Sequence, residues 1–404
     1  MKLPQVGPAV LVTAAFIGPG TVITASLAGA NYGFSLLWAL LFSVIATLIL
    51  QEMACRLGIV TKKGLGENIR STCTNPLLKF IAIGLTVSAI VIGNGAYQSG
   101  NILGASLGLS GIFSDAFIYS EISIWPLLIG VLAFTILIKG SYQFIESALM
   151  VLVGLMSFAF IATFIISKPD IGMFFSGLLI PSIPTGATLT VIALIGTTVV
   201  PYNLFLHSSS VSQKWHSPEQ LGEARKDLYF AIPLGGLISI AIVSTAASAF
   251  FGSNISINNA ADLAPALAPI FGDYSSLFIA IGLFSAGISS AITAPLAAAF
   301  ALSGILNLNK DLKSNAFKGI WLSILLIGVI VSCLGYKPVS IIWFAQVANG
   351  ILLPLVALFL LWIMNTETLG IYKNSKIQNL LGVGVVLVTL LLSGRSLMSA
   401  FGML

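Results

Sequence analysis

Two short stretches of the chain place prolines and glycines inside long apolar runs. Residues 17–21 read IGPGT, and residues 196–203 read GTTVVPYN. Because proline lacks an N–H and glycine is a poor helix former, each stretch should interrupt a helix. Free carbonyl groups at such an interruption attract cations, and free N–H groups attract anions. The two stretches are therefore candidates for a binding site, with proline kinks that serve only packing as the alternative.

The composition places both interruptions in a membrane. Of the 404 residues, 8% are charged and 57% are hydrophobic, and the mean hydropathy is +1.04. A soluble domain has about 25% charged residues, so a soluble enzyme, a nucleic-acid-binding protein and a disordered chain are excluded. The apolar residues form long blocks and do not alternate, which excludes an outer-membrane barrel. The cysteines Cys55, Cys73 and Cys333 are too scattered for a metal cluster or a disulfide framework.

Eleven apolar blocks are long enough to cross the hydrocarbon core, which takes about 20 residues per helix. The expected spans are 7–32, 34–57, 79–107, 123–138, 143–167, 188–212, 229–251, 276–306, 319–335, 339–365 and 379–398. The interruptions fall in the first and sixth spans, which are equivalent positions if the chain contains two repeats of five spans. Because each repeat has an odd number of spans, the second repeat has the opposite membrane orientation to the first. Paired interruptions at matching positions of two such inverted repeats indicate a transporter site.

The predicted fold is therefore an all-α polytopic membrane protein with a 5+5 inverted repeat and one extra helix. The first repeat covers residues 1–167, the second covers residues 188–365, and the extra helix covers residues 379–398. Together they form a single transmembrane domain. The helices of spans 1 and 6 are expected to be unwound near Gly18–Thr21 and Thr197–Pro201 and to face each other near the membrane midplane.

The charged residues indicate the orientation. With the N-terminus in the cytoplasm, fifteen Lys and Arg residues lie inside and three lie outside, as the positive-inside rule requires. Eleven spans then leave the C-terminus external. Two carboxylates fall near span ends. Glu52 precedes Arg56 by four residues, which favours an ion pair on one helix face, and Glu146 begins the fifth span; we expect structural roles for both.

Four segments in this order resemble the Nramp family of divalent-metal transporters, and the resemblance covers nearly the whole chain. They are GPAVLVTAAFIGPGTVITASLAGANYG at residues 7–33, TTVVPYNLFLHSS at 197–209, GLFSAGISSAIT at 282–293 and FAQVANGILLP at 344–354. The resemblance implies eleven or twelve helices in the inverted-repeat (LeuT-like) transporter fold, working by alternating access. It implies a transporter and not an enzyme, and we expect an integral protein of a bacterial inner membrane.

The chain departs from the family at the metal ligands. The family's Asp-Pro-Gly-Asn motif is GPGT at residues 18–21, so the carboxylate is absent and Thr21 replaces the Asn. The family's helix 6 Met is Val200, and the Ala whose carbonyl faces the metal aligns with Thr197. Gln346 in the tenth span is retained. The substrate-binding candidates are Gly18, Gly20, Thr21, Thr197, Val200 and Gln346.

The family's proton-handling residues are replaced as well. Asn94 and Tyr97 align with its Asp and Glu in the third span, so we expect no strong proton coupling. In the sixth span His207 is retained, whereas Tyr202 replaces a His. Asn94 and Tyr97 belong to one polar stripe in the third span, and Asn203 and His207 belong to another in the sixth span. With Tyr202 they are the pathway candidates, which we interpret as water-lined, with hydrogen bonding between helices as the alternative.

Such a neutral site suits only some substrates. Mn²⁺ and Fe²⁺ need anionic oxygen or softer ligands, whereas Mg²⁺ keeps several waters. Thr21, Thr197 and Gln346 could hold a hydrated divalent cation through water or backbone carbonyls, and the resemblance includes a branch associated with Mg²⁺. The alternatives are a small zwitterion or carboxylate, such as an amino acid held by helix N–H groups, and a non-transporting relative. The expected partners are the lipid bilayer and a small substrate, with no cofactor and no nucleic acid, and the sequence leaves the oligomeric state open.

Overall fold

The structure is a computed structural model that describes residues 7–9, 13, 17–113, 118–119, 122–139, 143–253 and 257–400. Regular structure in this part is helical apart from a small antiparallel hairpin of β1 (Ile118–Tyr119) and β2 (Ile122–Ser123). The long helices are α2 (Pro19–Tyr32), α3 (Leu37–Thr61), α5 (Pro76–Phe113), α6 (Trp125–Lys139), α7 (Gln143–Ile166), α9 (Thr188–Thr198), α10 (Pro201–Lys214), α11 (Leu221–Phe250), α13 (Ser275–Leu306), α14 (Asn315–Ser332), α15 (Pro338–Ile363) and α16 (Lys376–Ala400). Shorter helices include α4 (Leu65–Thr72), α8 (Ile171–Leu179) and α12 (Ala268–Phe271).

Helix length and composition agree with the predicted spans. Among the described residues, nine helical segments are long and apolar enough to cross a membrane, and α6 is a shorter apolar helix. Together with α2 they occupy all eleven predicted positions. One boundary prediction is wrong: α11 begins at Leu221 and not at residue 229. Residues 221–228, which were expected to precede the span, belong to the same helix. They are helical because Leu221, Ala224 and Leu228 bury one face of this part of α11.

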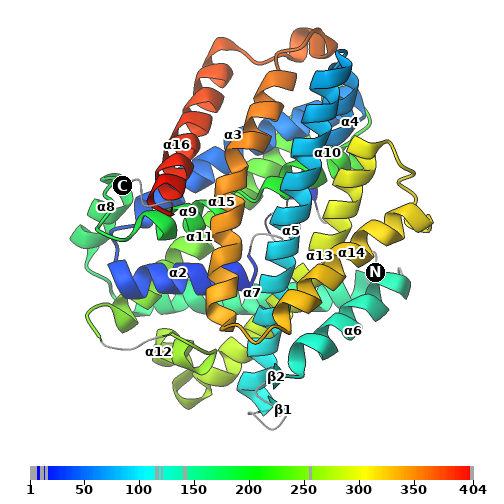
Figure 1. Cartoon of the computed structure of the whole chain (residues 1–404). Coiled ribbons are helices and arrows are strands. Elements are labelled where there is room, and N and C mark those ends of the chain that lie inside the picture. Colours follow the sequence, from blue (N-terminus) through cyan, green and yellow to red (C-terminus); the bar gives the residue numbers. More distant parts are fainter. Residues whose placement is uncertain are drawn as a thin grey trace.

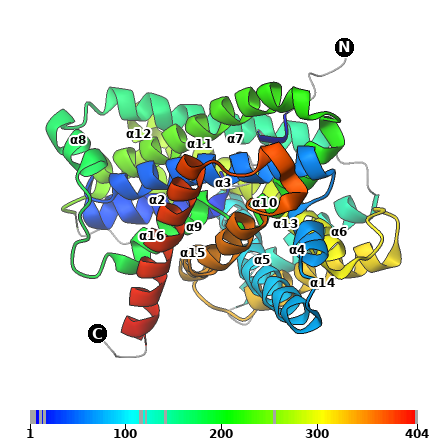
Figure 2. The same ribbon diagram turned by 90° about the horizontal axis from the view of Figure 1, so that it is seen from above.

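The interrupted helices lie inside the bundle. α15 lies against both α2 and α9, and α11 lies along α2 (Figures 1 and 2). α2 contacts α5, α9, α11 and α15, and α9 also contacts α3. The segment Thr188–Lys214, which contains the second interruption, is 89% buried in its most apolar window, more than any other candidate span. The irregular backbone therefore faces protein and not lipid, which is where a membrane protein tolerates it.

Two glycines allow this close approach. A Cβ atom at Gly29 of α2 would collide with the backbone carbonyl of Val243 in α11, and one at Gly196 of α9 would collide with the carbonyl of Gln346 in α15. Small residues at such positions let membrane helices pack backbone to backbone. The interrupted helices are thus held against their neighbours without intervening side chains.

Glu52 joins three elements at one end of the bundle. Its carboxylate accepts hydrogen bonds from Arg56 at 3.0 Å and from Arg225 of α11 at 2.7 Å. Arg56 also donates to the carbonyls of Tyr372 and Lys373, which precede α16. The predicted Glu52–Arg56 pair is confirmed, and its role is structural. The side chain of Glu146, the other carboxylate considered, lies outside the described residues.

Candidate substrate site between two helix interruptions

The first interruption covers Ile17 and Gly18. The Ile17 N–H donates to the Thr13 carbonyl at 3.1 Å, Gly18 is extended with φ −108° and ψ −176°, and Pro19 begins α2. At its end the break is shorter than predicted, since it stops at Gly18 and the expected unwinding continued to Thr21. Proline is favoured as the first residue of a helix, so Pro19 starts a new helix and the residues after it are already helical.

The second interruption covers Val199 and Val200. Val199 has φ −97° and ψ 68°, Val200 has φ −74° and ψ 122°, and Pro201 begins α10. This break is also shorter than the predicted Thr197–Pro201, and for the same reason. Because Pro201 has no N–H, the Thr197 carbonyl lacks its helical donor. The α9 end therefore presents carbonyl oxygen and the negative end of a helix dipole at the break.

The two interruptions meet through their threonines. The Thr21 and Thr197 hydroxyl oxygens are 2.8 Å apart, and both side chains are buried. Gln346 of α15 lies beside them, since a Cβ atom at Gly20 would collide with its amide nitrogen. That nitrogen donates to the Ile342 carbonyl at 3.3 Å, whereas the buried amide oxygen of Gln346 has no hydrogen-bond partner. The structure thus brings together Gly20, Thr21, Thr197 and Gln346, four of the six substrate-binding candidates.

Gly18 faces hydroxyl groups from two other helices. Its ideal Cβ position is 3.0 Å from Ser290 Oγ of α13 and 3.4 Å from Tyr97 Oη of α5. The sequence reasoning did not select Ser290, because hydroxyl residues occur throughout that span and no spacing distinguishes this one. Val200, in contrast, is part of the buried hydrophobic core, and its side chain offers no ligand atom.

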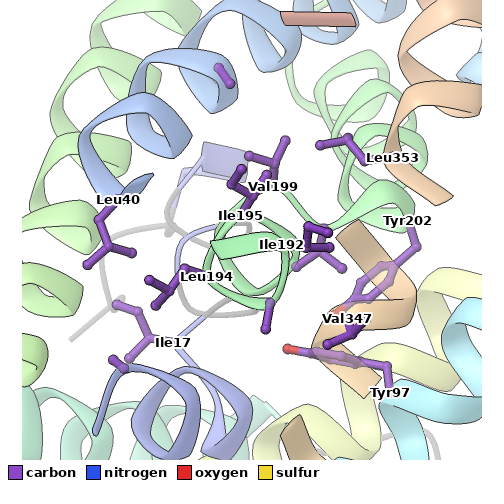
Figure 3. Close-up of a cluster of buried hydrophobic side chains, with 14 of the residues drawn as sticks. Ile17, Leu40, Tyr97, Ile192, Leu194, Ile195, Val199, Tyr202, Val347 and Leu353 are labelled. Atoms are coloured by element: carbon purple, nitrogen blue, oxygen red, sulfur yellow. The ribbon is translucent and has the colours of Figure 1, made fainter. Parts of the chain in front are cut away.

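Aromatic rings lie beside the site. Tyr97 of α5 and Tyr202 of α10 are arranged edge to face, with ring centroids 5.4 Å apart. Figure 3 shows these two rings next to Val347, with Ile192, Leu194 and Ile195 of α9 pointing into the surrounding apolar core. The polar site is therefore flanked by aromatic and apolar side chains.

A second polar group lies along α10. The His207 ring nitrogen Nδ1 is 2.7 Å from Gln51 Oε1 of α3. Because an amide oxygen only accepts, Nδ1 carries the proton in this pair, and Nε2 is left as a buried acceptor without a partner. The amide groups of Asn203 and Asn94 are also buried without hydrogen-bond partners. The sequence did not identify Gln51, which lies 156 residues from His207 along the chain.

The segment before the first interruption is fixed to α11. The Ala9 N–H donates to the Asp227 carboxylate at 3.0 Å. A Cβ atom at Gly7 would collide with the same carboxylate. Asp227 thus acts as an N-cap supplied by another helix, which satisfies an N–H group at the start of the chain's first helical turn.

The site is neutral. In the part of the chain that the structure describes, no group of three or more His, Cys, Asp or Glu residues is placed to hold a metal ion. The polar atoms near the interruptions are hydroxyl, carboxamide and backbone oxygens. Such atoms can accept hydrogen bonds from bound water, but they supply no full negative charge.

Residues 9–399 match the family model described as Nramp, natural resistance-associated macrophage protein-like. The chain belongs to the Nramp family. Two relatives named divalent metal cation transporter MntH are similar over almost their whole length. The Erwinia tasmaniensis protein is 28% identical, over 99% of this chain and 95% of its own. The Klebsiella pneumoniae subsp. pneumoniae protein is 26% identical, over 98% of this chain and 94% of its own.

Solved structures confirm the fold of this Nramp protein. The Eremococcus coleocola manganese transporter, in complex with an aromatic bis-isothiourea substituted compound, has a TM-score of 0.78 at 22% identity, covering 97% of this chain and 86% of that one. MhsT in complex with L-phenylalanine has a TM-score of 0.66 at 15% identity, covering 96% and 98%. At these identities the likeness concerns the fold alone.

The predicted family, the LeuT-like fold and the expectation of a membrane transporter and not an enzyme are confirmed. The repeat boundaries, the orientation of the termini and the individual site residues stay predictions. One fold-level neighbour is a manganese transporter and the other holds an amino acid, so the fold by itself does not select the substrate of this Nramp protein.

Proposed function

We propose that this Nramp protein transports a divalent cation by alternating access and takes it with much of its hydration shell, as suits Mg²⁺. The observation that carries the proposal is the neutral junction of the two interruptions, where the Thr21 and Thr197 hydroxyls meet at 2.8 Å beside the Gln346 amide. The similarity to proteins named divalent metal cation transporters supports a divalent cation as substrate.

The atoms at this junction suit a hydrated ion. Waters around a divalent cation are strong donors. The buried Gln346 amide oxygen is an acceptor without a hydrogen-bond partner, and the Thr197 carbonyl receives no helical hydrogen bond from Pro201. The negative end of the α9 dipole adds attraction for positive charge. Removing the waters from Mn²⁺ would require anionic or softer ligands, which Gly18 and Val200 do not supply. We therefore expect no clear preference for Mn²⁺ over Mg²⁺.

The pathway proposed from the junction follows α10. Buried polar groups without a partner are usually satisfied by ordered water. The amides of Asn94 and Asn203 and the Nε2 atom of His207 are such groups, and they support a water-lined passage for the hydrated ion. Because Asn94 and Tyr97 stand where the family carries acids, ion movement is not expected to be coupled stoichiometrically to protons.

The hydrogen bonds at α2 favour a cation over a carboxylate. A carboxylate would need free N–H groups at the start of this helix. The N–H groups of Thr21 and Val22 already donate to the Gly18 carbonyl, at 3.1 and 3.2 Å. An amino acid therefore meets fewer available donors here.

Flux into proteoliposomes with Mg²⁺, Mn²⁺, Ca²⁺ and small amino acids tests the proposal. We expect Mg²⁺ flux that falls about tenfold in Thr197→Val, which removes one hydroxyl of the junction. Thr198→Val is the matched control, because the Thr198 hydroxyl donates to the Leu194 carbonyl within its own helix. Amino-acid flux without cation flux would overturn the proposal, as would a tight Mn²⁺ preference or equal effects of the two variants.

A further inference from the structure

A cavity lies away from the interruptions, between α3, α11 and α16. Its volume is about 430 Å³. α3 contacts both other helices, and the three lie close together in the view from above (Figure 2). The residues that line it include Leu48, Ile49, Arg225, Tyr229, Gln378 and Leu381.

The walls of this cavity have two different characters. Leu48 and Ile49 of α3 and Leu381 of α16 give one apolar side. Glu52 of α3, Arg225 of α11 and Gln378 of α16 supply polar groups near the helix ends that lie on the predicted cytoplasmic side. A ligand that fills both parts must be amphipathic, with a polar head and an apolar tail.

The two charged residues of the cavity wall, Glu52 and Arg225, belong to a cluster with an excess of positive charge, because Arg56 lies behind the wall and also pairs with Glu52. Glu52 is a single carboxylate facing two guanidinium groups, those of Arg56 and Arg225, which leaves the three residues with a net charge of +1. Arg56 is 3% exposed, and it also donates to the carbonyls of Tyr372 and Lys373 and to the Asn374 side chain, all before α16. Arg225 remains 38% exposed although it pairs with Glu52. The unbalanced charge is therefore presented by Arg225, which lines the cavity.

The surroundings of the cavity are those of a helix surface facing lipid. Phe230 and Leu380 are each 72% exposed, Tyr229 is 54% exposed, and Leu381 is 47% exposed. Large apolar side chains are left uncovered in this way where acyl chains surround the protein. In the predicted orientation this end of the bundle meets the cytoplasmic leaflet, where anionic lipids attract basic residues.

We propose that this cavity binds one anionic phospholipid of the cytoplasmic leaflet. Its phosphate lies at Arg225 and Gln378, and an acyl chain follows Leu48, Ile49 and Leu381. The bound lipid joins α3, α11 and α16, so it stabilises the packing of the last helix on the bundle. This site is separate from the helix interruptions, and it does not depend on which ion is transported.

Lipid binding to the purified full chain tests the proposal. The protein is titrated in detergent with phosphatidylglycerol or with phosphatidylcholine of the same acyl chains, and bound lipids are counted by native mass spectrometry. We expect one phosphatidylglycerol to bind at least tenfold more tightly than phosphatidylcholine. Arg225→Gln, which removes the charge, and Leu381→Trp, which fills the apolar part, should each weaken that binding at least tenfold.

The controls are adjacent residues that do not line the cavity. Lys226→Gln removes the same charge from the next position of α11, and Leu380→Trp adds the same bulk at the next position of α16; neither should change the lipid count. If Arg225→Gln fails to fold, Leu381→Trp decides the test, because it leaves every charge in place. Equal losses in a variant and its control would overturn the proposal. If glycerol phosphate competes for the cavity as well as phosphatidylglycerol does, the cavity binds a soluble anion and the lipid proposal is wrong.

Discussion

Replacing Gly18 with Asp tests whether the missing charge accounts for the altered site. The backbone at Gly18 is extended, so any residue can adopt it. The new Cβ atom would lie 3.0 Å from Ser290 Oγ and 3.4 Å from Tyr97 Oη. A shift of a few tenths of an ångström therefore makes room, and two hydroxyl groups become available as donors to the carboxylate.

The size of the effect follows from elementary electrostatics. A charge of −1 at about 4 Å from a divalent cation contributes roughly 8 kcal/mol at an effective dielectric constant of about 20. Desolvation of both ions offsets most of this. We expect a net gain of about 1.4–2.8 kcal/mol for Mn²⁺, which is a ten- to hundredfold lower Kd. Without metal the buried carboxylate should destabilise the protein, because an unpaired intramembrane charge is unfavourable.

Calorimetry and thermal unfolding with and without Mn²⁺ measure both effects. At a hundredfold excess over its Kd, bound metal should stabilise the Gly18→Asp variant by about 2.7 kcal/mol. Gly18→Asn is the matched control, since it has the same shape without the charge. Adding Val200→Met supplies a soft ligand and should increase the preference for Mn²⁺ over Mg²⁺ further. If the Asp and Asn variants bind Mn²⁺ equally, the residue-by-residue alignment of this site is wrong.

Three further outcomes are expected. Gly20→Ala should weaken Mg²⁺ binding about tenfold in calorimetry because its Cβ displaces the Gln346 amide, whereas Gly84→Ala, with open space around it, should have no effect. Asp227→Ala should destabilise the helical turn at Ala9 by about 1 kcal/mol through loss of its cap, seen as faster hydrogen exchange there; unchanged exchange would contradict that role. A pH-sensitive dye in proteoliposomes should report no stoichiometric acidification during Mg²⁺ flux, and a robust substrate-dependent proton signal would refute uncoupled transport.

Features that depend on local sequence were predictable. Apolar blocks determine the spans because a helix must satisfy its backbone groups inside the bilayer. Pro19 and Pro201 located both interruptions, although the breaks end at these prolines and do not extend past them. The four-residue spacing of Glu52 and Arg56 was sufficient to predict their ion pair.

Contacts between distant segments were not predictable in the same way. Gln51 and His207, Ala9 and Asp227, and Gly18 and Ser290 each meet only because the bundle folds around the interruptions. No periodicity or short motif connects residues so far apart. Which residues of two helices contact each other depends on the rotation of each helix and on its depth in the membrane. A single sequence specifies neither.

The threonine pair has a consequence for the return half of the proposed transport cycle. In such a cycle the empty carrier must return to face the first side of the membrane. If its site contains a buried carboxylate, the charge of that carboxylate must be neutralised before the bundle can close around it. Here the Thr21 and Thr197 hydroxyls, 2.8 Å apart, satisfy each other when no substrate separates them. The unloaded protein is then electrically neutral at its centre, so the empty carrier needs no accompanying proton to reorient. Net flux would follow the ion's own electrochemical gradient, and its direction would be set by the membrane potential and the two ion concentrations.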